Sequence, residues 1–518
     1  MKGWRLATGL LLVGLVLWPA APVHAQSPVQ LWVDDDYCAV CTNDGHVWRA
    51  NAFSSISAAI HAAGAGGIIH VLPGRYREDV VIDRPCTLQG EGPGKVELMP
   101  RASDVTLIVA ANDTVVQGLE ISGGRQAGIL VLGPAFQREP IRRVAIRQNV
   151  LRGGLFGVAV NIDSSWAYGL LPALDVEIRN NTVTGCTRAI YVYNSQAAIT
   201  GNRVAELRPE GIGIYSSAGS VSEISDNTVQ VEAGGGQAIY ILDNRGTRID
   251  RNTLVGSTEI FSPTTGLALY NYADLALSNN TVRGFYWGAT GYTGGSARIT
   301  SNTFDGAVAW ALSLGTAITH TETLIQDNVI RGSYWGLRLD DDGGYGLQAA
   351  VQGNQLADNV VGILLGASVQ REQVRIHGND LCGNLVAGLR NESSAPVDAA
   401  ENWWGANDGP GPVGSGDRIE GAGGAMAAPW MYFAAVPQTL PGGRVIITAS
   451  LRGSHYALAN REMTFATDSG TFAETHTAGR SLRTDGRGEA QATLLPLHSL
   501  ATVSIRLGCG PALVLRVR

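Results

Sequence analysis

Lysine is almost absent from this 518-residue chain, which contains only Lys2 and Lys95. Arginine therefore carries nearly all the positive charge, and the formal net charge is -7 at pH 7. An acidic protein does not attract the phosphate backbone that dominates nucleic-acid affinity, so we expect no nucleic-acid partner. The deficit also excludes enzymes that use a lysine base beyond residue 95.

Long apolar runs are equally scarce, and the longest lies at the N-terminus. Lys2 and Arg5 precede an apolar stretch from Leu10 to Trp18, and Val23-His24-Ala25 has the small-residue pattern of a cleavage site. These features predict a secretory signal peptide over residues 1–25, whose removal takes away two cations and no acid and leaves a net charge of -9. The stretch is shorter than the roughly 20 residues that cross a bilayer, so we expect no transmembrane segment. The expected location is secreted, periplasmic or cell-surface.

Cysteines number only six, and an exported chain allows them to form disulfides. Cys38 and Cys41 are close enough to be joined. The other four are scattered along the chain, and we expect them to be mostly buried and free: Cys86, Cys186, Cys382 and Cys509.

A metal site near the first cysteine pair is the alternative to a disulfide. Asp34, Asp35, Asp36 and His46 lie within the same short segment as these two cysteines. Zinc normally takes four Cys or His ligands, and this segment offers three. We therefore expect a disulfide-stapled cap and no metal there.

Glycine, in contrast, is abundant, with 66 residues, and it accompanies a repeat. The stretch "SNNTVRGFYWG" (278–288) returns as "QDNVIRGSYWG" (326–336). An apolar residue, two variable residues, Asn, one variable residue and an apolar residue recur in register every 21 to 28 residues from Asn181 onward. The repeated asparagines are Asn181, Asn202, Asn227, Asn252, Asn280, Asn302, Asn328, Asn354 and Asn379. Such a period indicates a solenoid.

Each repeat also contains a Gly or Ala followed by an apolar-x-apolar triplet, as in Ala238-Ile239-Tyr240-Ile241. Alternation of this kind is typical of strands with one inward face, and no helix-length segment separates the repeats. We predict an all-β parallel β-helix with three strands per coil and about ten to twelve coils, each rising about 4.8 Å. The repeated Asn would adopt a left-handed bend and hydrogen-bond to the Asn of the neighbouring coil, forming a structural ladder.

The chain resembles the right-handed parallel β-helix repeat proteins of the pectin lyase-like superfamily, over roughly residues 30–430. The resemblance rests on the repeats, on "GGIIHVLPGRYREDVVIDRPCTLQGEG" (66–92) and on "ENWWGANDGPGPVG" (401–414). It implies that the helical stripe Phe53, Ile56, Ile60 and Ala63 caps the open end of the core. The expected boundaries are 26–100 for the cap and first coil and 101–436 for the repeats.

Residues 437–518 resemble a bacterial Ig-like domain of the invasin type. The segment "MTFATDSGTFAETHTAGRSLRTDGRGEAQATL" (463–494) carries short alternating strands and Gly-containing turns. The resemblance implies a small β-sandwich that acts as a spacer or an adhesive unit.

The outward positions of the Gly-led strands are rich in tyrosine. We expect one outward column to contain Tyr191, Gly213 and Tyr240 and the next to contain Tyr193 and Tyr215. Aromatic rings beside amides and acids suit sugars, which have apolar faces and hydroxyl edges. The candidate carbohydrate-binding residues are Tyr191, Tyr193, Tyr215, Tyr240, Tyr270, Tyr292, Asp163, Asp243 and Asn271. Alternatively, the tyrosines only stabilise the strand surface by stacking.

Arg338 with Asp340, Asp341 and Asp342 is the candidate catalytic group. Adjacent carboxylates could bind Ca²⁺, and an arginine base could then carry out β-elimination on a uronate. Alternatively, the aspartates form an ordinary acidic turn. The Gly-His-Gly and Arg-Ile-Lys motifs of the polygalacturonase-like branch are absent.

Three functions therefore remain open. The favoured one is a monomeric, secreted protein that binds polysaccharide or surface glycan with little or no catalysis and no required cofactor. The second is a polysaccharide lyase or hydrolase that uses Arg338 and the aspartates, with Ca²⁺ as its only conceivable cofactor. The third is a structural envelope or adhesion protein without a ligand.

Overall fold

The computed structural model describes residues 28–517 except 133–138, 163–170, 233, 293–294, 316–320, 342–346, 370–373 and 499. The predicted signal peptide and the candidate residues Asp163 and Asp342 lie outside the described residues. No helix within them is long and apolar enough to cross a membrane.

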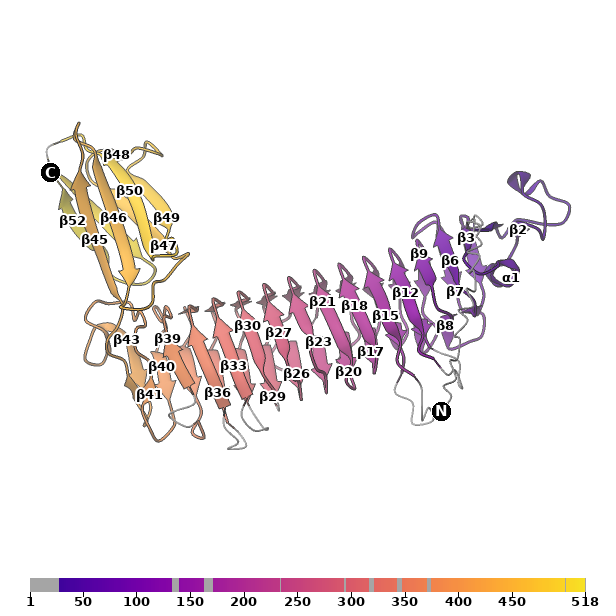
Figure 1. Ribbon diagram of the computed structural model, residues 1–518, viewed down its shortest axis with the longest axis horizontal. Helices are drawn as coiled ribbons and strands as arrows, with labels where there is room; N and C mark the ends of the chain where they lie inside the picture. The colour runs from indigo at the N-terminus through magenta and orange to yellow at the C-terminus, as the bar shows by residue number, and fades with distance from the viewer. Residues whose placement is uncertain are drawn as a thin grey trace, which may run out of the picture.

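Three parallel sheets run along a solenoid whose coils lie side by side in Figure 1. The chain passes from β15 (Leu174–Arg179) to β16 (Thr182–Thr184) and β17 (Arg188–Tyr193), and then returns as β18 (Gln196–Thr200) beside β15. We name the sheet that contains β15 and β18 sheet A, the one with β16 sheet B and the one with β17 sheet C. Each coil thus contributes one strand to each sheet. The predicted parallel β-helix with three strands per coil is confirmed.

Sheet A has 17 strands and is the largest of the three sheets. Its other strands are β1 (Gln30–Val33), β2 (Ala52–Phe53), β3 (Gly67–Val71), β6 (Cys86–Gly90), β9 (Thr114–Gln117), β12 (Arg142–Arg147), β21 (Val221–Ser225), β24 (Arg248–Asp250), β27 (Leu275–Ser278), β30 (Ala297–Thr300), β33 (Thr321–Gln326), β36 (Leu347–Gln352), β39 (Val374–His377), β41 (Val397–Asp398) and β44 (Ala425–Met426).

Sheet B has 12 strands, most of them three residues long. Besides β16 they are β4 (Gly74–Arg77), β7 (Val96–Met99), β10 (Glu120–Ser122), β13 (Val150–Arg152), β19 (Arg203–Ala205), β22 (Thr228–Gln230), β25 (Thr253–Val255), β28 (Thr281–Arg283), β31 (Thr303–Asp305), β34 (Val329–Arg331) and β37 (Gln355–Ala357).

Sheet C has 15 strands and carries the Gly-led and Ala-led segments. Besides β17 they are β5 (Val80–Ile82), β8 (Val105–Val109), β11 (Ala127–Val131), β14 (Phe156–Val160), β20 (Ile212–Ser217), β23 (Gln237–Leu242), β26 (Thr265–Tyr270), β29 (Trp287–Tyr292), β32 (Trp310–Gly315), β35 (Trp335–Asp340), β38 (Val361–Leu365), β40 (Ala387–Asn391), β42 (Pro410–Gly411) and β43 (Gly416–Glu420).

The core is a continuous apolar column inside the coils. Ile178, Ile199, Ile224 and Ile249 are paired strand to strand in sheet A, and each is fully buried. The apolar residues around each Asn therefore point inward, as the alternation predicts, and each coil is covered by the next one.

The repeated asparagines form a file of hydrogen bonds at the bend between sheets A and B. Asn181 Nδ2 donates to Asn202 Oδ1 over 3.0 Å, and Asn202 Nδ2 donates to Asn227 Oδ1 over 3.0 Å. Each amide also accepts from the backbone N–H of the preceding Asn, as Asn202 Oδ1 does from Asn181 at 2.9 Å. The same contacts continue to Asn402, and every member from Asn149 onward is buried.

The expectation that these asparagines adopt the left-handed conformation is wrong. The residue before each ladder Asn has the positive φ, for example Asn180 (φ 54°), Arg251 (φ 53°) and Ser301 (φ 57°). The ladder Asn must instead direct its amide along the stack, and it does so from ordinary backbone geometry. The bend therefore uses two positions, one for conformation and one for hydrogen bonding.

The N-terminal end of the core is covered by helix α1 (Ile56–Ala62) (Figure 1). Ser55 caps the helix by accepting from the Ala58 N–H at 3.2 Å, and the Glu78 carboxylate accepts from the N–H groups of Ile56 and Ser57. The predicted stripe Phe53, Ile56, Ile60 and Ala63 is buried. A short 3-10 turn, η1 (Asn43–Gly45), precedes the helix in the cap.

The C-terminal segment forms two four-stranded antiparallel sheets around a second apolar cluster. One contains β45 (Tyr432–Thr439), β46 (Val445–Arg452), β50 (Glu489–Leu495) and β48 (Thr471–Phe472); the other contains β49 (Gly479–Arg483), β47 (Glu462–Thr467), β51 (Ala501–Leu507) and β52 (Leu513–Val517). This sandwich begins at Tyr432, ahead of the expected boundary at 437. Its resemblance to Ig-like modules stays a prediction.

The sandwich is attached to the end of the β-helix by several bonds. Cys382 and Cys509 form a disulfide, so the expectation that both are free is wrong; Cys86 and Cys186 are free and buried. Sequence could not pair them because 127 residues separate them, and only the folded arrangement brings them together.

Charged side chains reinforce this junction. The Arg461 and Asp380 side chains, both nearly buried, form an ion pair at 3.4 Å. Burial raises the pKa of Asp380 to about 6, although Arg461 opposes the shift. The Glu401 carboxylate accepts from the His455 backbone N–H at 2.7 Å. The sandwich is therefore docked on the last coils and is not joined by a free linker.

Candidate functional site

The outer face of sheet C carries six tyrosines on nearby coils, here named the tyrosine file. They are Tyr191, Tyr193, Tyr215, Tyr240, Tyr270 and Tyr292. Tyr191 and Tyr215 stack at a centroid distance of 4.9 Å and 13°, and Tyr215 and Tyr240 at 5.0 Å and 8°. The file then shifts sideways, because Tyr270 is paired in register with Leu242 and not with Tyr240. Tyr240 and Tyr270 lie 5.5 Å apart at 36°, and the file ends with Tyr270 and Tyr292 at 6.0 Å.

The expected columns of this face need one correction. The strand register pairs Tyr215 with Tyr191 and Tyr240, so Tyr215 does not share a column with Tyr193. Gly213 occupies an inward position, where an added Cβ would lie 2.5 Å from Val229 Cγ1. The Gly-Ile-Gly-Ile sequence fits two registers, and the crowded interior selects the one in which the second glycine faces inward.

Arg188 is a further member of this face that the sequence reasoning missed. Its guanidinium carbon lies 5.1 Å from the Tyr215 ring centroid and 5.5 Å from that of Tyr191. Tyr191 itself is buried in an outer apolar cluster with Leu130 and Phe156. Tyr191 thus supports the face, whereas the half-buried Tyr193, Tyr215, Tyr240, Tyr270 and Tyr292 expose ring surface.

A second aromatic column lies beside the tyrosine file. Trp287 and Trp310 stack at 5.7 Å, and Trp310 and Trp335 lie 6.3 Å apart at 34°. Trp310 thus lies between Trp287 and Trp335, the two tryptophans of the repeated Trp-Gly. All three rings are half-exposed, so this column extends the aromatic surface toward the C-terminal coils.

The polar candidates of the tyrosine face lie at the bends that follow sheet C. Asp243 (φ 56°) and Asn271 (φ 47°) are exposed and have left-handed backbone conformations. The Asn271 amide donates to the Asp243 carboxylate. These two residues are suited to the bend conformation, and they also border the rings of Tyr240 and Tyr270 along the chain.

The candidate catalytic group is held together by its own bonds. Arg338 donates to Asp340 Oδ2 at 2.5 Å and to Ser313 Oγ at 3.2 Å, and it lies over the Trp310 ring. The other Asp340 oxygen accepts from Ser368 Oγ at 2.9 Å. Asp341 is fully buried. A proton transfer by Arg338 or Asp340 would have to break this network, so these two described members of the group are not an open acid–base pair.

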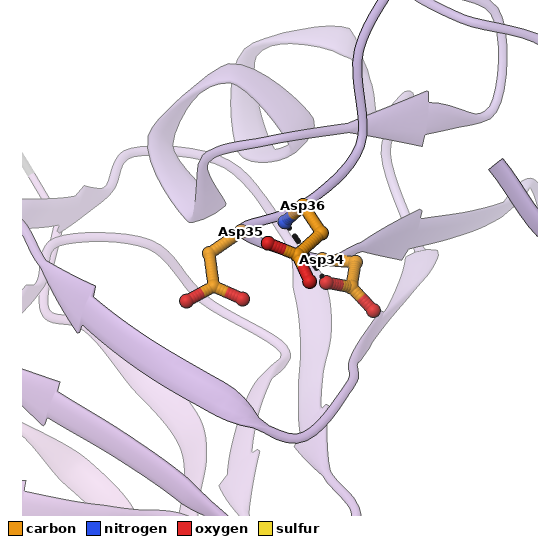
Figure 2. Close-up of side chains that lie close together, drawn as sticks. All are labelled: Asp34, Asp35 and Asp36. Carbon is orange, nitrogen blue, oxygen red and sulfur yellow. Dashed lines mark hydrogen bonds between the residues drawn. The ribbon is translucent and has the colours of Figure 1, made fainter. Parts of the chain in front are cut away.

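The acidic turn after β1 contains the one group of carboxylates among the described residues that could surround a cation. One oxygen from each of Asp34, Asp35 and Asp36 lies within 4.8 Å of the others (Figure 2). The dashed line in Figure 2 is the 3.0 Å bond from the Asp36 N–H to Asp34 Oδ1. The Asp34 carbonyl also accepts from the Tyr37 N–H at 3.1 Å, and Asp35 Oδ2 accepts from the Arg75 N–H at 3.3 Å, so protein hydrogen bonds account for the turn.

The structure removes the thiol ligands from the conceivable zinc site nearby. Cys38 and Cys41 form a disulfide. The His46 ring stacks on Trp32 at 4.0 Å. The segment is therefore a stapled cap in which neither sulfur is available as a thiolate.

One family model matches part of the solenoid. The family model described as a right handed beta helix region matches residues 158–330. The repeats form a right-handed parallel β-helix. Among curated proteins, none matches the chain.

Several solved structures share this fold at low similarity. The A-module of the mannuronan C-5 epimerase AlgE6 from Azotobacter vinelandii is 14% identical, with 72% of this chain and 94% of that chain covered and a TM-score of 0.33. A PL6 alginate lyase in complex with a trisaccharide is 12% identical (71% and 80% covered, TM-score 0.39). DFA-IIIase from Arthrobacter chlorophenolicus A6, without its lid, is 13% identical (70% and 90% covered, TM-score 0.37). Likenesses of this size concern the fold and give no information on activity.

Proposed function

We propose that this protein is an exported, monomeric β-helix protein that binds an extended polysaccharide or surface glycan along the tyrosine file, with little or no catalysis. The observation that carries the proposal is the run of half-exposed tyrosines on consecutive coils, in which Tyr215 stacks on Tyr240 and Tyr270 stacks on Tyr292. Rings stacked at this spacing cover one another's faces, so the file presents ring edges and hydroxyls to a ligand. The edges offer an apolar surface to successive sugar units, and the hydroxyls provide hydrogen bonds.

The arrangement favours binding over turnover. The aromatic surface extends over many coils through Trp287, Trp310 and Trp335, whereas Arg338 and Asp340 are bonded to each other. A long aromatic face on which the described candidates Arg338 and Asp340 are bonded to each other fits a polymer that is held and not cleaved. The docked sandwich would then position this face relative to a surface or a neighbouring module.

The test is a glycan array followed by isothermal titration calorimetry. We expect the triple variant Tyr215→Ala/Tyr240→Ala/Tyr270→Ala to bind the selected glycan at least about tenfold more weakly, since each aromatic contact contributes about 0.5–1.5 kcal/mol. Tyr432→Ala is the matched control, because Tyr432 is an exposed tyrosine on the sandwich. If the triple variant misfolds, the single variant Tyr240→Ala is titrated in its place. Unchanged affinity in both variants, or no bound glycan, would refute the proposal.

A further inference from the structure

The outer face of sheet A contains a hollow of about 480 Å³ over strands β15, β18, β21 and β24. It lies on a different face from the tyrosine file, and no sequence motif marks it. Its volume falls in the range of about 300–1,000 Å³ that is typical of small-molecule sites.

A short side chain between long ones creates this hollow. Ala198 is paired with Glu177 on one neighbouring strand and with Glu223 on the other. Strands in a sheet are about 4.8 Å apart, so the two glutamates lie about 9.6 Å apart at their backbones, with only a methyl group between them. Ala198 is therefore the floor, and the glutamates are two of the walls.

The other side chains that line the hollow include two arginines and an exposed valine. Arg179 lies 3.6 Å from Glu177, and Arg248 is paired in register with Glu223. Among the described residues, neither Glu223 nor Arg248 forms an ion pair within 4.0 Å, although Glu223 also attracts Arg251; both are exposed. Val221, with 45% of its surface exposed, adds an apolar edge.

We propose that this hollow is a second saccharide subsite, selective for neutral sugar units; that its ligand is a saccharide rests on the proposed function. Carboxylates accept hydrogen bonds from sugar hydroxyls, guanidinium groups donate to them, and Val221 packs against the apolar face of a ring. Asp175, Glu177 and Glu223 outnumber the two arginines, so a uronate is repelled.

The position of the hollow supports the same ligand as the tyrosine file. Strands β18, β21 and β24 directly follow β17, β20 and β23, which carry Tyr191, Tyr215 and Tyr240. The hollow and the stacked rings thus lie on the same coils, on the two sides of the bends between sheets C and A. A polymer bound along the tyrosine file therefore lies within one coil of the hollow.

The experiment fills the hollow without removing any bond. Ala198→Gln places a long side chain on the floor, and Ala145→Gln is its matched control because Ala145 is half-buried in the same column, is paired with Glu177, and does not line the hollow. The probes are hexasaccharides of glucose, N-acetylglucosamine, mannose and galacturonate, titrated by calorimetry into the full chain. Glu223→Gln, which keeps the side-chain size, is the second variant if Ala198→Gln misfolds.

We expect two sites for at least one neutral hexasaccharide, and a loss of one of them in Ala198→Gln but not in Ala145→Gln. Glu223→Gln should weaken the same site three- to tenfold. A single site that is insensitive to both variants but lost in the tyrosine triple variant overturns this proposal and leaves the proposed function intact. A single site lost in Ala198→Gln and unchanged in the tyrosine variant supports the hollow and overturns the tyrosine face. Preference of the hollow for galacturonate overturns its selectivity.

Discussion

At the scale of single residues, the bend between sheets A and B uses two neighbouring positions, one for the positive φ and one for the amide hydrogen bonds. From the sequence alone, a single Asn is expected to serve in both roles. Asn180 adopts φ 54°, whereas the next residue, Asn181, provides the amide that joins three coils. Any residue that tolerates a positive φ can serve at the first position, and Gln, Gly, Asp, Arg, Ser and Glu all occur there. The second position needs a short side chain with a donor and an acceptor, and Asn provides both.

Replacing a ladder residue should therefore cost far more than replacing its neighbour. Asn181→Ala leaves the buried N–H of Asn149 and the carbonyl of Ile146 without their partners, and each such loss costs about 1–3 kcal/mol. We expect a lower midpoint of denaturant unfolding, equivalent to about 2–5 kcal/mol. Asn180→Gly is the control and should change stability by less than about 0.5 kcal/mol, because glycine accepts a positive φ. Equal effects of the two variants would contradict the division of roles.

At the scale of elements, the short helix α1 covers the apolar interior that the first coil would otherwise expose. An exposed solenoid end favours self-association. Ile56 and Ile60 are fully buried against that end, and Glu78 binds the first N–H groups of the helix. The helix is short, so these tertiary contacts stabilise it more than helix propensity does.

A charge on the buried side of α1 should disrupt the cap. Ile60→Asp would bury an unpaired carboxylate, so the helix should detach and the variant should form oligomers or polymers in size-exclusion chromatography with light scattering. His61→Asp, at the exposed neighbouring position of the same helix, should stay monomeric. Monomeric behaviour of both variants would show that the first coil needs no cover.

At the scale of the whole molecule, the sandwich stands at an angle on the C-terminal end of the β-helix (Figure 1). The disulfide between Cys382 and Cys509 joins them, and Arg461 donates to the Gly353 carbonyl at 3.0 Å as well as pairing with Asp380. A spacer module on a flexible linker would have no such bonds. The orientation of the sandwich relative to the tyrosine face is therefore fixed by the structure.

Removing the disulfide should destabilise the sandwich without undocking it at room temperature. The bond spans 127 residues, for which the chain-entropy estimate gives a contribution of about 4–5 kcal/mol. We expect Cys382→Ser/Cys509→Ser to lower the calorimetric transition of the sandwich, while small-angle X-ray scattering at 25 °C shows unchanged dimensions because the Arg461 and Glu401 contacts remain. Cys38→Ser/Cys41→Ser is the control and should leave that transition unchanged. A variant with an unchanged transition would show that the disulfide does not hold the junction.

The sequence by itself determined the parallel β-helix, its three strands per coil and its inward faces. The physical reason is that every coil must bury the same positions against the next coil, so the pattern is written in each repeat. The short spacing of Cys38 and Cys41 also predicted their disulfide, and the apolar stripe at Phe53, Ile56 and Ile60 predicted the cap.

Only the tertiary structure decided how coils align and what distant segments meet. Tyr215 joins the column of Tyr191 because Gly213 must fit inside, and this depends on Val229 from the sheet B strand of the next coil. The hollow over Ala198 exists because of the residues one coil above and one below. The partners of Cys382 and Asp380 come from the sandwich, more than 80 residues along the chain, and no local pattern specifies them.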